Sequence, residues 1–399
     1  MRTGPRVIDL NGPASGFHDF HPDRSLNFQC NRWLEWIGPD AYPAIAETAR
    51  AAHTYPEWID RFLALAEKTR REGNALAGAY YDRAAEFFMA PDDSRKAPAR
   101  RRFVETMRGL YDVSPEPVPY ENGWLPTLDL WPEQAPKGPT VLLFGGFDSY
   151  LEEFLPMLAA IVAAGYRVVA FEGPGQGGAL EEAGLTLTPD WERPVSAILD
   201  HYRLEDVTAV GISLGGGLVI RAAAFEPRIK RAVAFDILDD LLEALGGQIA
   251  SGINPLLRVL LAMRARPIVN TAARFAAARQ PVSRWGIWQG MHVTGTSSAF
   301  DFLQFARAVN TRAISGNVTA DTLLLAGAED HYVPLHQLRR QADNLTAARS
   351  VTTRVFTAAE QASNHCQVGN FGACVREILA WADGVSAPRS AVPESADTT

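Results

Sequence analysis

The residues with the clearest chemical meaning lie in the pentapeptide Gly-Ile-Ser-Leu-Gly at positions 211–215. It follows the apolar run 207–211 and precedes an alanine-rich segment, so we expect a sharp turn from strand to helix with Ser213 at its apex. Glycines on both sides leave room for this turn, and the N-terminus of the following helix favours negative charge beside the hydroxyl. The setting predicts a nucleophilic serine, although the pentapeptide alone would also fit an ordinary tight turn.

A nucleophilic serine needs a base to take its proton and a carboxylate to orient that base. Asp330 closely follows the apolar run 322–327, and catalytic groups gather at the carboxyl ends of parallel strands. We expect Asp330 to be the acid, with Glu329 as its rival and turn capping as the structural alternative for Asp330. His365 is the expected base because it lies in the loop after the last predicted strand, giving the chain order serine, acid, histidine.

The other histidines fit the role of base less well. Four precede the serine, one lies in a segment that we expect to form a lid, and two lie beside the acid: His18, His21, His53, His201, His292, His331 and His336. Cys366 adjoins the expected base and suggests thiol chemistry. Because the turn itself carries serine, we expect Cys366 to pack in the core.

An acyl-transfer site also needs backbone N–H groups aimed at the oxyanion that forms during attack on a carbonyl. One expected donor is the N–H of Leu214, the residue after the nucleophile. The other is the N–H of Phe147, because Gly145 and Gly146 allow a tight turn after the apolar run 140–144. The sequence thus offers a nucleophile, an acid, a base and an oxyanion turn, and their joint occurrence is more specific than any one of them.

Short apolar runs separated by Gly/Pro turns and helical segments must position these residues. The predicted strands are 125–133, 140–144, 167–171, 207–211, 231–235, 322–327 and 352–356. Several are apolar throughout, as expected of strands that helices cover on both faces. The alternation of strands and helices predicts a doubly wound, mainly parallel sheet of the α/β class.

The pattern along the chain also predicts its domain organisation. We expect an N-terminal helical cap region at 1–114, an α/β core at 115–237 and 313–385, an inserted helical lid at 238–312 and a disordered tail at 386–399. Within the lid, residues 283–295 are predicted to form an aromatic turn region. Residues 74–89 resemble one tetratricopeptide helix, but a lone repeat cannot bury its apolar face, so an ordinary helical subdomain is preferred over a protein-interaction module.

The composition is that of an ordinary globular protein and excludes several classes of partner. Of 399 residues, 47% are hydrophobic, enough for a large core, and the net charge of −8 with scattered basic residues argues against nucleic acid or an anionic membrane as partner. No apolar run reaches the ~18 residues of a membrane span. Three cysteines without metal-like spacing suggest reduced thiols, no metal site and a cytoplasmic location.

A second glycine-rich segment, residues 171–178, formally matches the dinucleotide fingerprint G-x-G-x-x-G. That fingerprint belongs after the first strand of its unit, whereas two predicted strands already precede this segment. No strong helix signal follows it. We therefore expect no nucleotide and no other cofactor.

Five segments together resemble one branch of the α/β-hydrolase superfamily: GGFDSYLEE, FEGPGQGG, GISLGG, GAEDHYVP and NHCQVGN. This branch contains fermentation–respiration-switch-type esterases, 2,6-dihydroxypseudooxynicotine hydrolase and fungal hydrolases that shorten polyketide chains in pigment formation. The resemblance covers most of the chain, including the aromatic segment 17–36. It implies an α/β-hydrolase fold with helical cap elements and a triad of Ser213, Asp330 and His365.

The same resemblance implies that Asp148 faces the active site and contacts the substrate. In part of the branch this position holds Glu, which is one methylene longer. The alternative for Asp148 is a structural role as the cap of a helix expected to begin near Leu151.

The sequence as a whole predicts a serine hydrolase with a small or mid-sized carbonyl substrate. Either an ester or a C–C bond in a β-dicarbonyl or polyketide-like compound would be cleaved, as a step of secondary metabolism. Trp285 and Trp288 in the lid, with Phe147, suggest an apolar or aromatic acyl group, although Trp also serves as ordinary lid packing. The alternatives are acyl transfer or cyclisation under a dry lid and a non-catalytic ligand-binding protein. The expected partners are the substrate and, for the N-terminal helices, a second copy in a homodimer.

Overall fold

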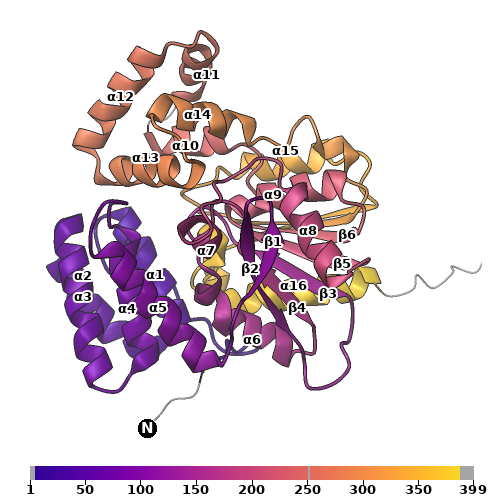
Figure 1. The fold of residues 1–399 in the computed structure, drawn as a ribbon, viewed down its shortest axis with the longest axis horizontal. Coiled ribbons are helices and arrows are strands. Elements are labelled where there is room, and N and C mark those ends of the chain that lie inside the picture. The colour runs from indigo at the N-terminus through magenta and orange to yellow at the C-terminus, as the bar shows by residue number, and fades with distance from the viewer. Residues whose placement is uncertain (1–4, 250–251, 387–399) are drawn as a thin grey trace, which may run out of the picture.

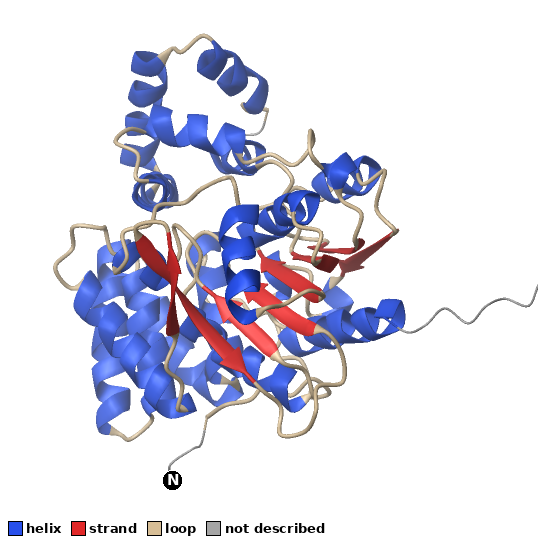
Figure 2. Ribbon diagram, turned by 45° about the vertical axis from the view of Figure 1, so that its right-hand side comes forward, coloured by secondary structure: helices blue, strands red, loops and turns tan. Residues whose placement is uncertain are grey.

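An eight-stranded, mostly parallel sheet forms the centre of the molecule (Figure 2). The computed structural model describes residues 5–249 and 252–386. The spatial order is β1-β2-β4-β3-β5-β6-β7-β8, in which β1 and β2 are antiparallel to their neighbours and the other strands are parallel. The strands are β1 (Glu116–Tyr120), β2 (Gly123–Leu130), β3 (Thr140–Phe144), β4 (Val168–Phe171), β5 (Val207–Ile212), β6 (Ile229–Phe235), β7 (Asp321–Gly327) and β8 (Ser350–Phe356).

Each predicted apolar run overlaps one of these strands, and the doubly wound, mainly parallel architecture is confirmed. Every residue of β3, β4, β5 and β7 is buried, which explains why their sequences are apolar rather than alternating. The sequence analysis missed β1, whose residues Glu-Pro-Val-Pro-Tyr contain two prolines. Proline cannot donate a ladder hydrogen bond and is tolerated here because β1 is an edge strand.

Helices cover both faces of the sheet (Figure 1). One face packs against α6 (Leu155–Ala163) and α16 (Phe371–Ser386), and the other against α8 (Glu192–Tyr202) and α9 (Leu214–Phe225). Two further helices flank the core, α7 (Gly177–Glu181) and α15 (His336–Asn344). The carboxyl ends of β5, β6 and β7 therefore remain the region where loops can assemble a site.

The N-terminal region consists of helices that lie beside the sheet. They are α1 (Arg24–Ile37), α2 (Tyr42–Ala51), α3 (Tyr55–Arg71), α4 (Ala75–Phe87) and α5 (Lys96–Tyr111). Side chains of Asp23, Thr54 and Asn74 accept hydrogen bonds from the first turns of α1, α3 and α4, as N-cap residues do. The apolar core of these helices is continuous with the side of the sheet that carries α6 and α16.

A second group of helices stands over the other end of the sheet, at the top of Figure 1. It contains α10 (Leu241–Ile249), α11 (Asn254–Ala262), α12 (Arg266–Arg279), α13 (Pro281–Thr294) and α14 (Ala299–Ala308). The prediction of an aromatic turn region at 283–295 is wrong, because α13 runs through it. Proline in the first turn of α13 and the left-handed Gly295 at its end are ordinary helix boundaries.

Two further predictions concern the C-terminal tail and membrane-spanning segments. Ser386 closes α16, and the rest of the predicted tail, 387–399, lies outside the described residues. No described helix is both long and apolar enough to cross a membrane.

Candidate active site

Ser213 occupies a strained turn between β5 and α9. Its φ of 61° and ψ of −119° lie outside the backbone regions that residues with side chains ordinarily adopt. The residues two positions before and after Ser213 must be glycine: a Cβ at Gly211 would overlap the carbonyl of Gly215, and a Cβ at Gly215 would lie 2.6 Å from the Gly145 oxygen. The backbone N–H of Ser213 donates to the Phe235 carbonyl at 2.7 Å, which ties the turn to the end of β6.

His365 and Asp330 complete a chain of hydrogen bonds that begins at this serine. The Ser213 Oγ lies 2.8 Å from His365 Nε2, and His365 Nδ1 lies 2.7 Å from Asp330 Oδ2. His365 begins the short 3-10 helix η5 (His365–Gln367), and Asp330 lies in the loop after β7. The sequence analysis expected these three residues to meet, and the structure brings them together from points 35 and 152 residues apart.

The second oxygen of Asp330 holds its own loop in place. Asp330 Oδ1 accepts hydrogen bonds from the backbone N–H groups of Tyr332 at 2.6 Å and Val333 at 3.1 Å. The turn-capping role and the contact with the histidine therefore coexist in one side chain. Glu329 points elsewhere and accepts a hydrogen bond from the Ser363 hydroxyl at 2.7 Å.

Asp330 and His365 each stabilise the charged form of the other. Burial by itself raises the pKa of Asp330, but His365 and the two backbone donors outweigh burial and hold the pKa below its ordinary value. Burial by itself lowers the pKa of His365, but the carboxylate of Asp330 outweighs it and raises the pKa well above the ordinary value. His331 next to the acid is different: burial lowers its pKa to about 3, so it stays neutral.

The two expected oxyanion donors, the N–H groups of Phe147 and Leu214, lie in two turns that pack against each other beside Ser213. A Cβ at Gly146 would lie 2.8 Å from the Ile212 oxygen and 3.0 Å from the Leu214 nitrogen, so the turn after β3 packs directly on the serine turn. Gly146 N–H donates to Ser149 Oγ at 3.0 Å. Among the hydrogen bonds of residues 5–249 and 252–386, none uses the backbone N–H of Phe147 or Leu214. Both residues line the cavity above Ser213.

Asp148 lines this cavity and does not cap a helix. Its side chain pairs with Arg32 of α1, with Asp148 Oδ1 and Arg32 Nη1 3.3 Å apart. The short 3-10 helix Leu151–Phe154 has Tyr150 as its N-cap residue, and the N–H of Leu151 donates to the Glu172 carboxylate at 2.7 Å. The capping alternative is therefore wrong.

A buried ion network from the N-terminal helices supports the oxyanion turn. Arg83 of α4 donates to the backbone carbonyl of Asp148 and pairs with Glu86. Arg32 binds the buried Glu153 through its Nε at 2.6 Å, and the hydroxyl of Tyr150 donates to Glu86 at 2.8 Å. These charges are buried but paired, as they must be to avoid a large desolvation cost. The N-terminal helices thus help to hold the residues that line the site.

A cavity of about 450 Å³ extends from Ser213 and His365 to the second group of helices. Its far walls are apolar and come from α10 to α13, with side chains such as Leu245, Ile253, Leu257, Leu260, Val269 and Ile287. Pockets of this kind, apolar with few polar groups, are typical of small-molecule sites. Its polar edge is formed by Arg32, Asp148 and Glu153.

The two tryptophans of α13 have different surroundings. Trp285 lines the cavity, stacks on Phe87 with ring centroids 4.7 Å apart, and donates from Nε1 to the Phe87 carbonyl at 2.7 Å. Trp288 is 38% exposed and lies under the Arg284 guanidinium, and it is not among the lining residues. The expectation that Trp288 lines the site is corrected, because α13 is a regular helix that turns this ring toward solvent.

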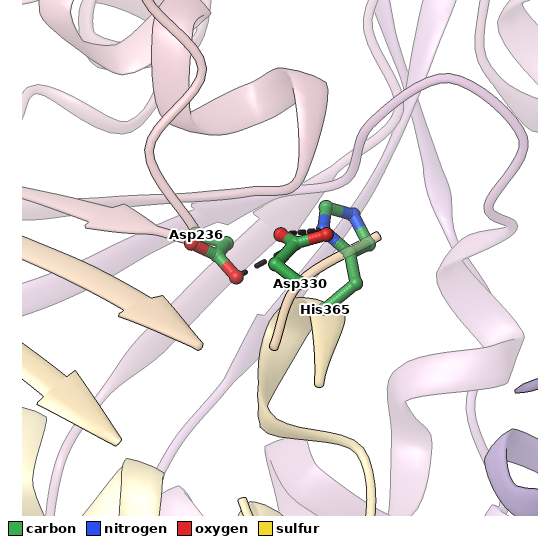
Figure 3. A group of neighbouring side chains, drawn as sticks. All are labelled: Asp236, Asp330 and His365. Atoms are coloured by element: carbon green, nitrogen blue, oxygen red, sulfur yellow. Dashed lines mark hydrogen bonds and ion pairs between the residues drawn. The ribbon is translucent and has the colours of Figure 1, made fainter. Parts of the chain in front are cut away.

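The sequence analysis missed one acidic residue at the site, Asp236. It follows β6 directly, is 1% exposed, and has its Oδ2 3.8 Å from His365 Nδ1 (Figure 3). Its position at the carboxyl end of a buried strand was the available signal. Asp236, Asp330 and His365 place ligand-type atoms within 4.8 Å of one another, a spacing that also suits a metal ion. However, Asp330 Oδ2 and His365 Nδ1, two atoms that a metal ion would have to bind, are already joined by a hydrogen bond of 2.7 Å.

Comparisons with known proteins identify similar hydrolases. The family model described as "alpha/beta hydrolase fold" matches residues 139–366. The hydrolase acrC of Aspergillus aculeatus is 30% identical over 78% of this chain and 84% of its own length. The 20-hydroxy-prefusarin hydrolase of Gibberella moniliformis is 27% identical over 84% of this chain and 88% of its own length.

Two solved structures share the fold over most of the chain. The 2,6-dihydroxy-pseudo-oxynicotine hydrolase superposes with a TM-score of 0.62 at 19% identity, over 89% of this chain and 94% of its own. AbyA5 superposes with a TM-score of 0.63 at 18% identity over the same shares. At these identities the likeness concerns the fold, including helices outside the region that the family model matches.

Proposed function

The chain belongs to the alpha/beta hydrolase fold family and is a hydrolase, and we propose that it cleaves a carbonyl substrate through Ser213, His365 and Asp330. The observation that carries the proposal is the unbroken chain Ser213–His365–Asp330, with contacts of 2.8 and 2.7 Å, at the floor of a largely apolar cavity. The bond cleaved is an ester or a C–C bond next to a carbonyl.

In the first half of the reaction, His365 Nε2 takes the proton of the Ser213 hydroxyl while Oγ bonds to the substrate's carbonyl carbon. The negative charge that moves to the carbonyl oxygen is stabilised by the N–H groups of Leu214 and Phe147. Asp330 keeps Nδ1 of the imidazole protonated and stabilises the imidazolium. When the tetrahedral intermediate collapses, His365 returns the proton to the leaving group, which is an alcohol oxygen or the carbon of an enolate.

In the second half, water attacks the acyl group on Ser213. His365 takes one proton from this water and returns it to Oγ, so that serine and histidine end in their starting states. The product is a carboxylic acid. The enzyme therefore needs one water per turnover and no other reactant.

The cavity supports a substrate that is mainly apolar and carries a few polar groups. Walls from α10 to α13 exclude water from the acyl chain, whereas Asp148 and Arg32 offer hydrogen bonds to hydroxyl or carbonyl groups at the opposite edge. The names of two similar proteins specify a hydroxylated prefusarin and a dihydroxylated pseudo-oxynicotine as their substrates. A hydroxylated, polyketide-like carbonyl compound of secondary metabolism fits the same description.

A substrate panel tests this proposal. The purified protein and its Ser213→Ala variant are assayed with aryl esters of increasing acyl length and with aryl β-diketones, following release of the phenol and loss of the diketone. We expect turnover of at least one class by the wild type and none by the variant. Turnover of esters alone would remove the C–C cleavage part of the proposal, and turnover of neither class by folded protein would contradict the whole.

A further inference from the structure

Asp236 and Asp330 place two buried carboxyl groups behind the same histidine. In Figure 3, Asp236 lies on one side of Asp330 and His365 on the other. The exposed fractions are 1% for Asp236 as a whole and 2% for the side chain of Asp330. One oxygen of each carboxyl group and one ring nitrogen of His365 lie within 4.8 Å of one another. Two buried carboxylates that share such a site repel each other, so one of them favours its protonated form.

The neighbours of Asp236 show which of the two groups holds the proton. Asp330 has His365 at 2.7 Å and two backbone N–H donors, all of which favour its charged form. From the described part of the chain, Asp236 receives two weaker bonds, both on Oδ2: from the N–H of Cys366 at 3.1 Å and from Gln367 Nε2 at 3.3 Å. Its Oδ1 is buried and accepts no hydrogen bond from the described residues.

We propose that Asp236 is a positioning residue: its carboxyl stays protonated and donates a hydrogen bond to the Asp330 carboxylate, which fixes that carboxylate against His365. The proposal rests on the function proposed above for Ser213, His365 and Asp330. Asp236 exchanges no proton during turnover, since the proton of the serine moves only to His365 and onward to the leaving group. The imidazole thus faces one negative charge rather than two.

The other groups around Asp236 agree with this assignment. Besides Asp330 and His365, the titratable groups that face it are the thiols of Cys366 and Cys374, and burial raises the pKa of both thiols, which keeps them neutral. Burial and the adjacent Asp330 raise the pKa of Asp236 well above its ordinary value, whereas that of Asp330 is lowered. The backbone at Asp236 is also held closely, because a Cβ on Gly216 of α9 would overlap its carbonyl oxygen.

Asp236→Asn and Asp236→Ala give the test. Asparagine has nearly the same shape, carries no charge and can donate a hydrogen bond to Asp330, whereas alanine removes the donor. The readout is the rate at which a fluorophosphonate labels Ser213 from pH 5 to 9, which reports on the Ser213–His365 pair without any knowledge of the substrate. The melting temperature of each variant is measured alongside.

We expect Asp236→Asn to label within about threefold of the wild-type rate, with the same pH midpoint. We expect Asp236→Ala to label about tenfold more slowly or worse, as when outer partners of a functional histidine are removed. A midpoint that falls by one pH unit or more in Asp236→Asn would overturn the proposal, because removing a real negative charge lowers the pKa of His365.

Equal labelling rates in wild type and a folded Asp236→Ala would overturn it as well. If the alanine variant does not fold, the pH midpoint of the asparagine variant still decides. Failure of the proposed function looks different: the wild-type Ser213 would then not react with the probe at any pH.

Discussion

Gly146→Ala tests the oxyanion turn, and its added Cβ would also lie 3.0 Å from the Cβ of Ser213. The new Cβ would lie 2.8 Å from the Ile212 oxygen and 3.0 Å from the Leu214 nitrogen, whereas ordinary contacts begin at 3.4 Å. The turn after β3 and the turn at Ser213 must therefore move apart by about 0.5 Å, the tolerance within which catalytic geometry has to be held. This displacement separates the two N–H donors that face the oxyanion.

The expected cost follows from what such donors contribute. Complete loss of one oxyanion donor lowers kcat by about 10²–10³. A displacement of about 0.5 Å leaves part of the interaction, so we expect kcat to fall by about 10- to 100-fold. KM should change little, since the donors act mainly on the charge of the transition state.

The assay is steady-state hydrolysis of whichever aryl ester or β-diketone the wild type turns over. Gly109→Ala is the matched control: this exposed glycine lies in α5, does not line the cavity, and its added Cβ would meet nothing within 4 Å. A folded Gly146→Ala protein with wild-type kcat would refute the assignment of Phe147 and Leu214 as oxyanion donors.

Three other predictions concern pH and the cavity wall. Because only neutral His365 can accept the serine proton and its pKa is raised, kcat/KM should increase with pH through a midpoint above 6.5, and a midpoint below 6.5 would contradict the pairing with Asp330. Trp285→Ala should raise KM for bulky acyl groups by about tenfold or more, whereas Trp288→Ala should leave it unchanged, as substrate titrations would show. Burial raises the pKa of Glu35 to about 7 from 4.5. The folded state then binds an extra proton between these values, so the free energy of unfolding should fall by about 3 kcal/mol as the pH rises through them. Glu35→Gln should remove that part of the slope in denaturant titrations, and an unchanged slope would show that Glu35 titrates normally.

The part of the site that follows local chain rules could be read from the sequence. The serine turn needs glycines at fixed positions, and the acid and the histidine follow strands whose apolar sequences mark them clearly. The chain order then selected His365 among the histidines, and the structure places its imidazole 2.8 Å from Ser213. The strands that helices cover on both faces could also be predicted, because their sequences are apolar.

Other features depend on contacts that a sequence does not display. Asp236 follows a strand just as Asp330 does, but only the packing of two loops shows that both carboxyls meet at one histidine. The role of Arg32 and Arg83 depends on the N-terminal helices lying against the oxyanion turn. Residues 283–295 were predicted to form an aromatic turn region, yet tertiary packing makes most of that segment part of α13.

The most direct test of the central claim is to treat the folded protein with a fluorophosphonate probe and locate the adduct by mass spectrometry. We expect a single adduct on Ser213, abolished in Ser213→Ala and formed much more slowly in His365→Ala, because the histidine that lies 2.8 Å away activates the hydroxyl. An unlabelled Ser213 in folded protein, or equal labelling of the Ser213→Ala variant, would contradict it.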